Sequence, residues 1–144
     1  MKKILVTIIS IIAFSSCSKD DDNNNNSTPT GNIVGKWNID RAGAIENGVE
    51  VDIEPFSGNI SGCQKDYQEF SADGNYNLGD YTNNACNITI GIGSWTKEGN
   101  IIKISGGQFA TYEIVSLTET TMKLKFKNPS QIDEYTDTFY LIKN

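Results

Sequence analysis

Residues 121–127 read Thr-Met-Lys-Leu-Lys-Phe-Lys, a strict alternation of apolar and basic side chains. Because successive side chains of a β-strand point to opposite faces of the sheet, this pattern predicts a strand with one dry and one wet face. Met122, Leu124 and Phe126 form the dry face. The lysines of the wet face also discourage pairing with a further strand.

The same kind of pattern continues in both directions from this strand. From Ile33 onward, short apolar alternations are separated by Gly, Asn and Asp, and no long helical period occurs. The most specific turn signal is Asn47-Gly48, because both residues tolerate positive φ. Other turns are predicted at residues 71–74, 98–100 and 118–120, and a last strand at residues 135–142.

Consecutive hairpins of this kind predict an all-β fold. About eight strands in roughly 110 residues fit an antiparallel up-and-down barrel better than a sandwich with long crossovers. A strand that ends close to the C-terminus can pair with the first strand, and this pairing would remove the exposed edges of the sheet.

The N-terminus has the composition of an export signal. Lys2 and Lys3 precede an apolar run over residues 4–14, whose length of about 11 residues is below the roughly 20 needed to span a bilayer. Two serines and Cys17 follow, and this arrangement resembles a bacterial lipobox, in which the cysteine receives a diacylglyceryl group and becomes the first residue after cleavage. We expect residues 1–16 to be a lipoprotein signal peptide that is removed, and Cys17 to carry lipid.

Residues 17–31 contain almost nothing to bury, so we expect a flexible tether behind the lipidated cysteine. The charged residues in this tether resemble the signal that sends lipoproteins of the Bacteroidetes to the outer face of the outer membrane. They are Lys19, Asp20, Asp21 and Asp22. The resemblance implies that a lipid anchor attaches the domain of residues 32–144 to the bacterial outer membrane. It also implies that the domain faces the cell surface, with the periplasmic face as the alternative.

Composition excludes several function classes. The net charge of −6 argues against nucleic-acid binding, which depends on clustered Lys and Arg. The chain has no histidine, so catalytic triads with histidine are excluded. With only two cysteines besides Cys17, a structural zinc site of the usual Cys and His ligands cannot be assembled either. Two carboxylates can hydrolyse a glycoside, but no spacing singles out a pair among the candidates Asp66, Glu69, Asp73 and Glu113. We expect no enzyme activity, no cofactor and no metal site.

Two cysteines, Cys63 and Cys86, remain when Cys17 is assigned to lipid. In an exported protein such a pair most simply forms a disulfide. The loop of about 23 residues that it closes would stabilise the fold by roughly 3 kcal/mol in the chain-entropy model. Two free thiols are the alternative, because spacing alone does not prove a bridge.

A series of separated motifs resembles the lipocalin-like domain found in small lipoproteins of the Bacteroidetes. The motifs are Gly35-Lys36-Trp37, Cys63-Gln64-Lys65-Asp66, residues 69–76, Cys86, Gly93-Ser94-Trp95 with Gly99-Asn100, Leu117-Thr118, Met122-Lys123-Leu124 and Tyr140-Leu141. The resemblance implies that Trp37 plugs the closed end of the barrel, where a large aromatic can bury its rings.

Two hypotheses of function follow. The first is a barrel that binds a small apolar or amphipathic ligand, with Met122, Leu124 and Phe126 as pocket lining. This depends on a cavity, because a barrel of about eight strands can also be filled by its own side chains. The second is a non-catalytic surface module that binds a protein or a glycan through the barrel loops. Tyrosines would supply aromatic area for such an interface, and they are Tyr67, Tyr76, Tyr81, Tyr112, Tyr135 and Tyr140.

Overall fold

The computed structural model describes residues 31–107, 109–127 and 135–144. The predicted signal peptide, Cys17 and the acidic signal from Lys19 to Asp22 lie outside the described residues, as does the predicted tether before Gly31. In the described part of the chain, no helix is long and apolar enough to cross a membrane.

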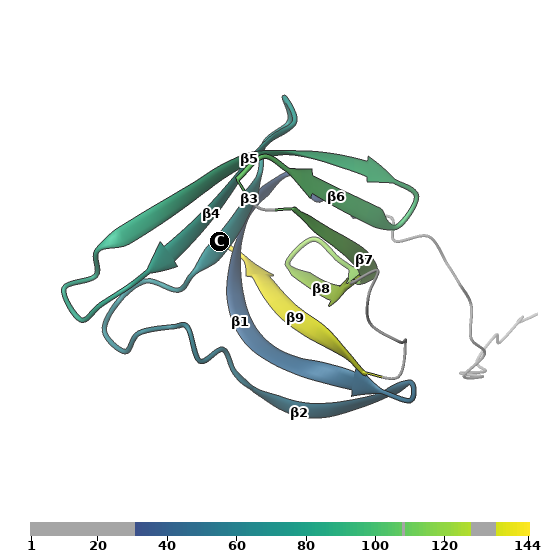
Figure 1. Cartoon of the computed structure of the whole chain (residues 1–144), viewed down its shortest axis with the longest axis horizontal. Helices are drawn as coiled ribbons and strands as arrows, with labels where there is room; N and C mark the ends of the chain where they lie inside the picture. The colour runs from purple at the N-terminus through teal and green to yellow at the C-terminus, as the bar shows by residue number, and fades with distance from the viewer. Residues whose placement is uncertain (1–30, 108, 128–134) are drawn as a thin grey trace, which may run out of the picture.

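The described residues form one antiparallel sheet, whose order is β2-β1-β3-β4-β5-β6-β7-β8-β9. Because β1 pairs also with β9, β1 and β3 to β9 close into an eight-stranded barrel (Figure 1). This confirms the predicted fold, with β2 as an addition outside the closed ring. The strands are β1 (Gly35–Glu46), β2 (Val49–Pro55), β3 (Tyr67–Phe70), β4 (Asn75–Tyr81), β5 (Ile88–Glu98), β6 (Ile101–Ser105), β7 (Ala110–Leu117), β8 (Thr121–Phe126) and β9 (Tyr135–Lys143).

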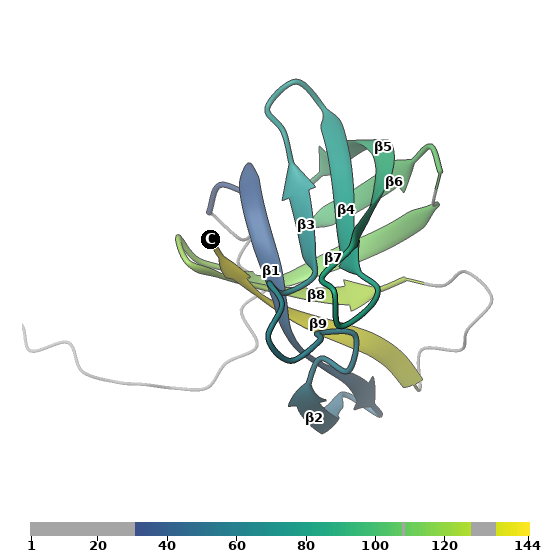
Figure 2. The same cartoon turned by 90° about the vertical axis from the view of Figure 1, so that its left-hand side faces the viewer.

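β1 has two partners on the same edge. Its first residues, Gly35 to Asn38, pair with β3, whereas Arg41 to Glu46 pair with β2. Figure 2 shows β2 below the rest of the barrel, at the far end of β1. The predicted hairpin turn joins the two strands, and Asn47 and Gly48 have φ values of 49° and 80°. Two consecutive positive φ values are typical of the tight turns that match the twist of the flanking strands.

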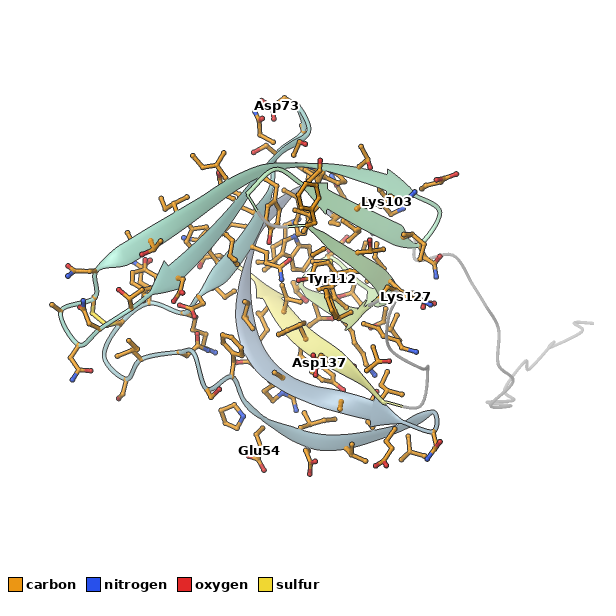
Figure 3. The ribbon with its side chains drawn as sticks, viewed as in Figure 1. Glu54, Asp73, Lys103, Tyr112, Lys127 and Asp137 are labelled. Carbon is orange, nitrogen blue, oxygen red and sulfur yellow. A yellow bond between two sulfur atoms is a disulfide. The ribbon has the colours of Figure 1, made fainter. Side chains whose placement is uncertain are left out.

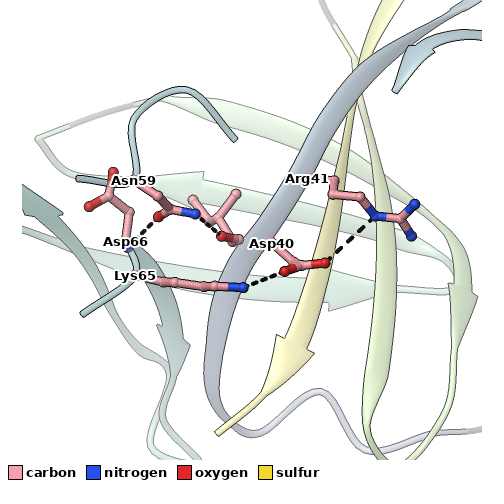
Figure 4. Close-up of polar contacts among 6 residues, drawn as sticks. Asp40, Arg41, Asn59, Lys65 and Asp66 are labelled. Carbon is pink, nitrogen blue, oxygen red and sulfur yellow. Dashed lines mark hydrogen bonds and ion pairs between the residues drawn. The ribbon is translucent and has the colours of Figure 1, made fainter. Parts of the chain in front are cut away.

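A polar cluster holds the point where β1 changes partners (Figure 4). Asn59, from the loop between β2 and β3, donates its Nδ2 to the carbonyl oxygen of Ile39 at 2.7 Å. Its Oδ1 accepts the backbone N–H of Asp66 at 2.9 Å. The Asn59 side chain therefore continues the hydrogen bonding between β1 and the segment before β3, where no strand ladder exists. Lys65 pairs with Asp40 beside it.

The structure joins Cys63 and Cys86 in a disulfide, with the two Cα atoms 5.3 Å apart. The bridge links the loop between β2 and β3 to the loop between β4 and β5. Both loops lie at the same end of the barrel, so the disulfide holds this end together.

Side chains fill the other end of the barrel, where β1 begins and β9 ends. Trp37 is fully buried there, and its Nε1–H donates to the carbonyl oxygen of Ile33 at 2.7 Å. This is the place that the resemblance implies for a plug. The other apolar side chains with at most 1% exposure are Phe70, Ile102, Ile114, Met122, Leu124 and Leu141. Two of the three residues predicted to line a pocket, Met122 and Leu124, thus belong to the packed core.

Candidate ligand-binding site at the barrel mouth

The end of the barrel opposite Trp37, which we call the mouth, carries a row of aromatic side chains. Phe56, Tyr112, Phe126 and Phe139 form this aromatic wall, and each is only partly buried. Tyr112 lies edge-on to Phe126 and to Phe139, with ring centroids 5.6 and 6.3 Å apart, and Phe56 lies 6.2 Å from Phe139. Such edge-to-face contacts stabilise a fixed arrangement of the rings.

Strand register explains why these rings face the interior. Phe139 pairs with Leu124, which has no exposed surface, and directly paired residues share a face of the sheet. Tyr112 pairs in the same way with Ile102 and with Phe126. Phe126 is therefore the one predicted lining residue that lies in the mouth.

The wall across the mouth, on β4 and β5, is small and polar. Leu78 faces the interior and pairs with Gly91, and one step nearer the rim Asp80 pairs with Thr89. Because residues two apart share a face, Asp80 and Thr89 also face the mouth. A Cβ placed on Gly91 would meet only atoms of Leu78, at 3.7 and 3.8 Å. Gly91 thus leaves only a small gap in front of the strand: the space that it lines with Tyr76, Leu78 and Ile104 is about 10 Å³, roughly enough for one water molecule.

Two larger hollows lie at the surface of the barrel. A hollow of about 470 Å³ opens at the rim, and Phe126, Ile104 and Ala110 border it together with Phe109 and Lys127. Phe126 is the one residue of the aromatic wall that borders it, and Lys103, Ser105 and Thr111 border it from the outer faces of β6 and β7. Its volume exceeds the roughly 300 Å³ at which small-molecule pockets begin. A second hollow, of about 250 Å³, lies on the outer face of β1, β8 and β9; it is bordered by residues that include Arg41, Met122, Lys123 and Tyr140.

Gln68 places a polar atom inside the barrel. Its side chain is 2% exposed, and it pairs with Trp37 on one side and Leu78 on the other, so it faces inward. Its Oε1 is buried with no hydrogen-bond partner among the described residues. A buried acceptor without a partner is rare in folded proteins, because its desolvation costs about 1–3 kcal/mol.

Burial controls the ionisation of two side chains at this end of the barrel. The pKa of Asp66 is raised, mainly by burial and further by the nearby charge of Asp80, although its Oδ1 accepts the backbone N–H of Tyr81 at 2.8 Å. Burial also raises the pKa of Tyr112 to about 12, so this phenol stays neutral.

The raised pKa of Asp66 gives a prediction about stability. An acid whose pKa is higher in the folded state favours folding below its unfolded pKa, and this contribution is lost as pH rises through the folded pKa. Asp66→Asn keeps the acceptor for Tyr81 and stays neutral. We expect its urea midpoint to exceed that of the wild type at pH 7 and to match it near pH 3. The exposed control Glu119→Gln should show no such pH-dependent gain, and a less stable Asp66→Asn at pH 7 would contradict the assignment.

The structure does not bring the four candidate carboxylates together. Glu69 accepts from Asn77 at 3.1 Å, Asp73 accepts from Asn75 in the turn after β3, and Glu113 pairs with Lys127 at 3.0 Å. Asp66 lies at the mouth. Across residues 31–107, 109–127 and 135–144, no three His, Cys, Asp or Glu side chains are grouped so that they could hold a metal ion.

The tyrosines proposed for an interface are mostly packed into the fold. Tyr67 and Tyr76 are buried, and Tyr112 belongs to the aromatic wall. Tyr81 and Tyr140 are half-buried: the Tyr81 hydroxyl donates to Gln64 at 2.9 Å and the Tyr140 hydroxyl to Glu50 at 2.6 Å. The side chain of Tyr135 lies outside the described residues.

The sequence interpretation missed Phe56, Gln68 and Phe139. The alternation Phe139-Tyr140-Leu141 places Phe139 on the same face as Leu141, so a search for the dry face of the last strand could have found it. No local signal marks Phe56, because it reaches the mouth from a loop whose path depends on Asn59 and the disulfide.

Comparisons with known proteins agree with this architecture. The sequence model of the lipocalin-like domain matches residues 33–124. An uncharacterized protein from Bacteroides eggerthii has a similar crystal structure, with a TM-score of 0.55 and 12% sequence identity over 78% of this chain and 100% of that one. A lipocalin-like protein from Bacteroides uniformis has a TM-score of 0.51 and 12% identity, over 78% of this chain and 98% of that one. No curated protein matches the sequence.

Proposed function

The chain belongs to the lipocalin-like domain family, and from this premise we propose that its barrel binds a small apolar or amphipathic molecule at the mouth. Members of this family are generally non-catalytic binding proteins. The observation that carries the proposal is the aromatic wall of Phe56, Tyr112, Phe126 and Phe139, four inward-facing or mouth-facing rings that remain partly exposed.

Packing limits where such a ligand can lie. Trp37, Met122 and Leu124 fill the closed half of the barrel, so the ligand would lie across the mouth and not deep along the axis. The hollow of about 470 Å³ beside Phe126 is the space at the rim that could take such a ligand, since the space between Leu78 and Gly91 is only about 10 Å³. A ligand there would bury the exposed edges of the rings, and apolar burial contributes about 25 cal/mol per Å².

The second part of the proposal concerns location. The lipobox-like residues ending in Cys17, and the charged residues from Lys19 to Asp22 behind it, support attachment of the mature protein to the bacterial outer membrane through lipid. Several acyl chains on one cysteine satisfy the requirement that stable anchoring takes more than one chain or signal. Because the residues behind Cys17 resemble an export signal, we propose that the barrel faces the cell surface.

Binding of a neutral apolar dye tests the ligand site. The whole barrel lies between Gly35 and Lys143, so the mature chain from residue 17 with Cys17→Ser contains it and needs no detergent. N-Phenylnaphthylamine should become fluorescent on binding, and Phe139→Ala should weaken its affinity about ten-fold, because a large part of one ring contact is lost. The matched control is Ile92→Ala, since Ile92 is 71% exposed on the outside of the barrel.

If the dye binds the wild type, Phe139→Ala and Ile92→Ala with one affinity, the mouth is not its site. If the dye does not bind the wild type at all, the barrel offers no apolar site.

One observation favours the alternative function, a surface module that binds a protein. Ile88, Ile90 and Ile92 point outward from β5 and are 41%, 50% and 71% exposed, which gives an apolar row on the outside of the sheet. Exposed apolar patches of this kind often mark interaction sites. Crosslinking on intact cells separates the two functions: a partner captured by the wild type and lost from Ile90→Lys, with dye binding unchanged, would support the protein-binding module.

A further inference from the structure

The hollow of about 470 Å³ at the rim has both apolar and basic surface. Phe109, which is 85% exposed, and the partly buried Phe126 give it apolar surface. Lys103 and Lys127 border the same hollow, and Figure 3 shows both lysines on the right-hand side of the barrel. No Asp or Glu among the described residues borders it. The local charge is therefore opposite to the net charge of the chain, which is −6.

Strand register brings the two lysines to one level of the barrel. Lys103 on β6 pairs with Thr111 on β7, and the backbone N–H of Lys127, directly after β8, donates to the carbonyl oxygen of Thr111 at 2.7 Å. Lys103 points outward, because it alternates with the buried Ile102 and Ile104, and its neighbours across the sheet share that face. Directly paired residues are about 5 Å apart, and each lysine has a flexible four-carbon stem. Both ammonium groups can therefore reach one acidic group above Thr111.

The carboxylates near these lysines leave both ammonium groups able to bind a ligand. Lys103 lies 3.7 Å from Glu98, but the two side chains are 62% and 88% exposed, and such exposed pairs contribute little. Glu113 lies 3.0 Å from the Nζ of Lys127 and also accepts from the Nδ2 of Asn100 at 3.2 Å. An ammonium group has three N–H donors, so the contact with Glu113 leaves Lys127 with donors for a ligand.

From this arrangement we propose that the ligand of the rim hollow is an amphipathic acid. Its acidic head lies between Lys103 and Lys127, above the hydroxyl group of Thr111. Its apolar part packs on Phe109 and Phe126. This inference rests on the proposed ligand-binding function and adds the chemical class of the ligand. Charge-assisted hydrogen bonds to a carboxylate are about twice as strong as neutral ones, whereas an ammonium head would face two like charges.

Titration calorimetry with two probes of equal chain length tests the proposal. Decanoate and decylammonium are titrated below their micelle concentrations at pH 7 into the mature chain from residue 17 with Cys17→Ser. We expect decanoate to bind about ten-fold or more tightly than decylammonium, although the net charge of −6 favours the cation. The preference should shrink in 0.5 M salt, because salt screens exposed charges.

Variants locate the preference. Lys103→Gln/Lys127→Gln should bring the affinities of the two probes to within about three-fold of each other. The control Lys65→Gln/Lys97→Gln makes the same change in net charge, and it should leave the preference intact because neither residue borders the hollow. Phe109→Ala should weaken decanoate about five-fold, because apolar contact is lost. Thermal midpoints of all variants check that they are folded.

The failures are distinguishable. If neither the dye nor either probe binds the wild type, the proposed function fails. If the dye binds but decanoate binds no more tightly than decylammonium, the acidic-head proposal is overturned while the apolar site stands. The same holds if the double Lys variant keeps the wild-type preference. If only Phe109→Ala has no effect, the apolar part of the ligand lies elsewhere, and the assignment of the rim hollow as its site is overturned.

Discussion

Trp37→Ala should lower the free energy of unfolding by about 3–5 kcal/mol, the usual cost of removing a large buried aromatic. Trp37 has no exposed surface, and its indole N–H donates to the carbonyl oxygen of Ile33 at 2.7 Å, so the variant leaves both a cavity and an unpaired acceptor. Because small domains are stable by only about 5–15 kcal/mol, a large part of the population could unfold. Urea denaturation followed by circular dichroism measures the change.

Trp95 provides the matched control for Trp37. It also donates its indole N–H to a backbone oxygen, that of Ser71 at 3.0 Å, but it is only partly buried. Trp95→Ala should therefore cost less than Trp37→Ala. If the two variants lose the same stability, Trp37 is not the plug that closes this end of the barrel.

Cys17→Ala should release the protein from the membrane almost completely. The net charge of −6 gives the chain no electrostatic attraction to anionic lipid, so in our proposal the acyl chains on Cys17 supply the attachment, at about 0.8 kcal/mol per buried methylene. Fractionation of cells, combined with metabolic labelling by a palmitate analogue, measures both effects. The wild type should be labelled and sediment with membranes, and the variant should be unlabelled and soluble.

Cys63→Ala is the control for this experiment, since Cys63 is paired with Cys86 and takes no part in anchoring. That variant should keep its label and its membrane fraction even if the barrel becomes less stable. A wild-type protein recovered in soluble form with an unmodified Cys17 would contradict the anchor and, with it, the proposed location at the outer membrane.

Local patterns in the sequence were sufficient to predict the strands and turns named here, because alternation and turn residues depend only on neighbouring positions in the chain. The alternation of residues 121–127 predicted β8, and Asn47-Gly48 predicted the turn between β1 and β2, which has the expected positive φ values. The closure of the barrel followed from the position of the last strand. It is confirmed by the pairing of β1 with β9.

The candidate site was harder to predict. Alternation shows which side of a strand faces the barrel interior, but it does not show how far along the barrel axis a residue lies. Alternation placed Met122, Leu124 and Phe126 on one face, but only Phe126 lies near the rim, where the closed-end packing around Trp37 no longer covers it. The division of β1 between two partners was also hidden. It depends on Asn59, which donates to the carbonyl oxygen of Ile39 and accepts the backbone N–H of Asp66, and these positions are far apart in the chain.

Native mass spectrometry tests the central claim most directly. The mature chain with Cys17→Ser, exported to the periplasm of its own cells and purified without detergent, should carry a small apolar or amphipathic molecule. Phe139→Ala should lose that molecule, whereas Ile92→Ala should retain it. A wild-type protein that leaves the cell with nothing bound, and then does not take up the dye, would contradict the view that the barrel mouth is a ligand site.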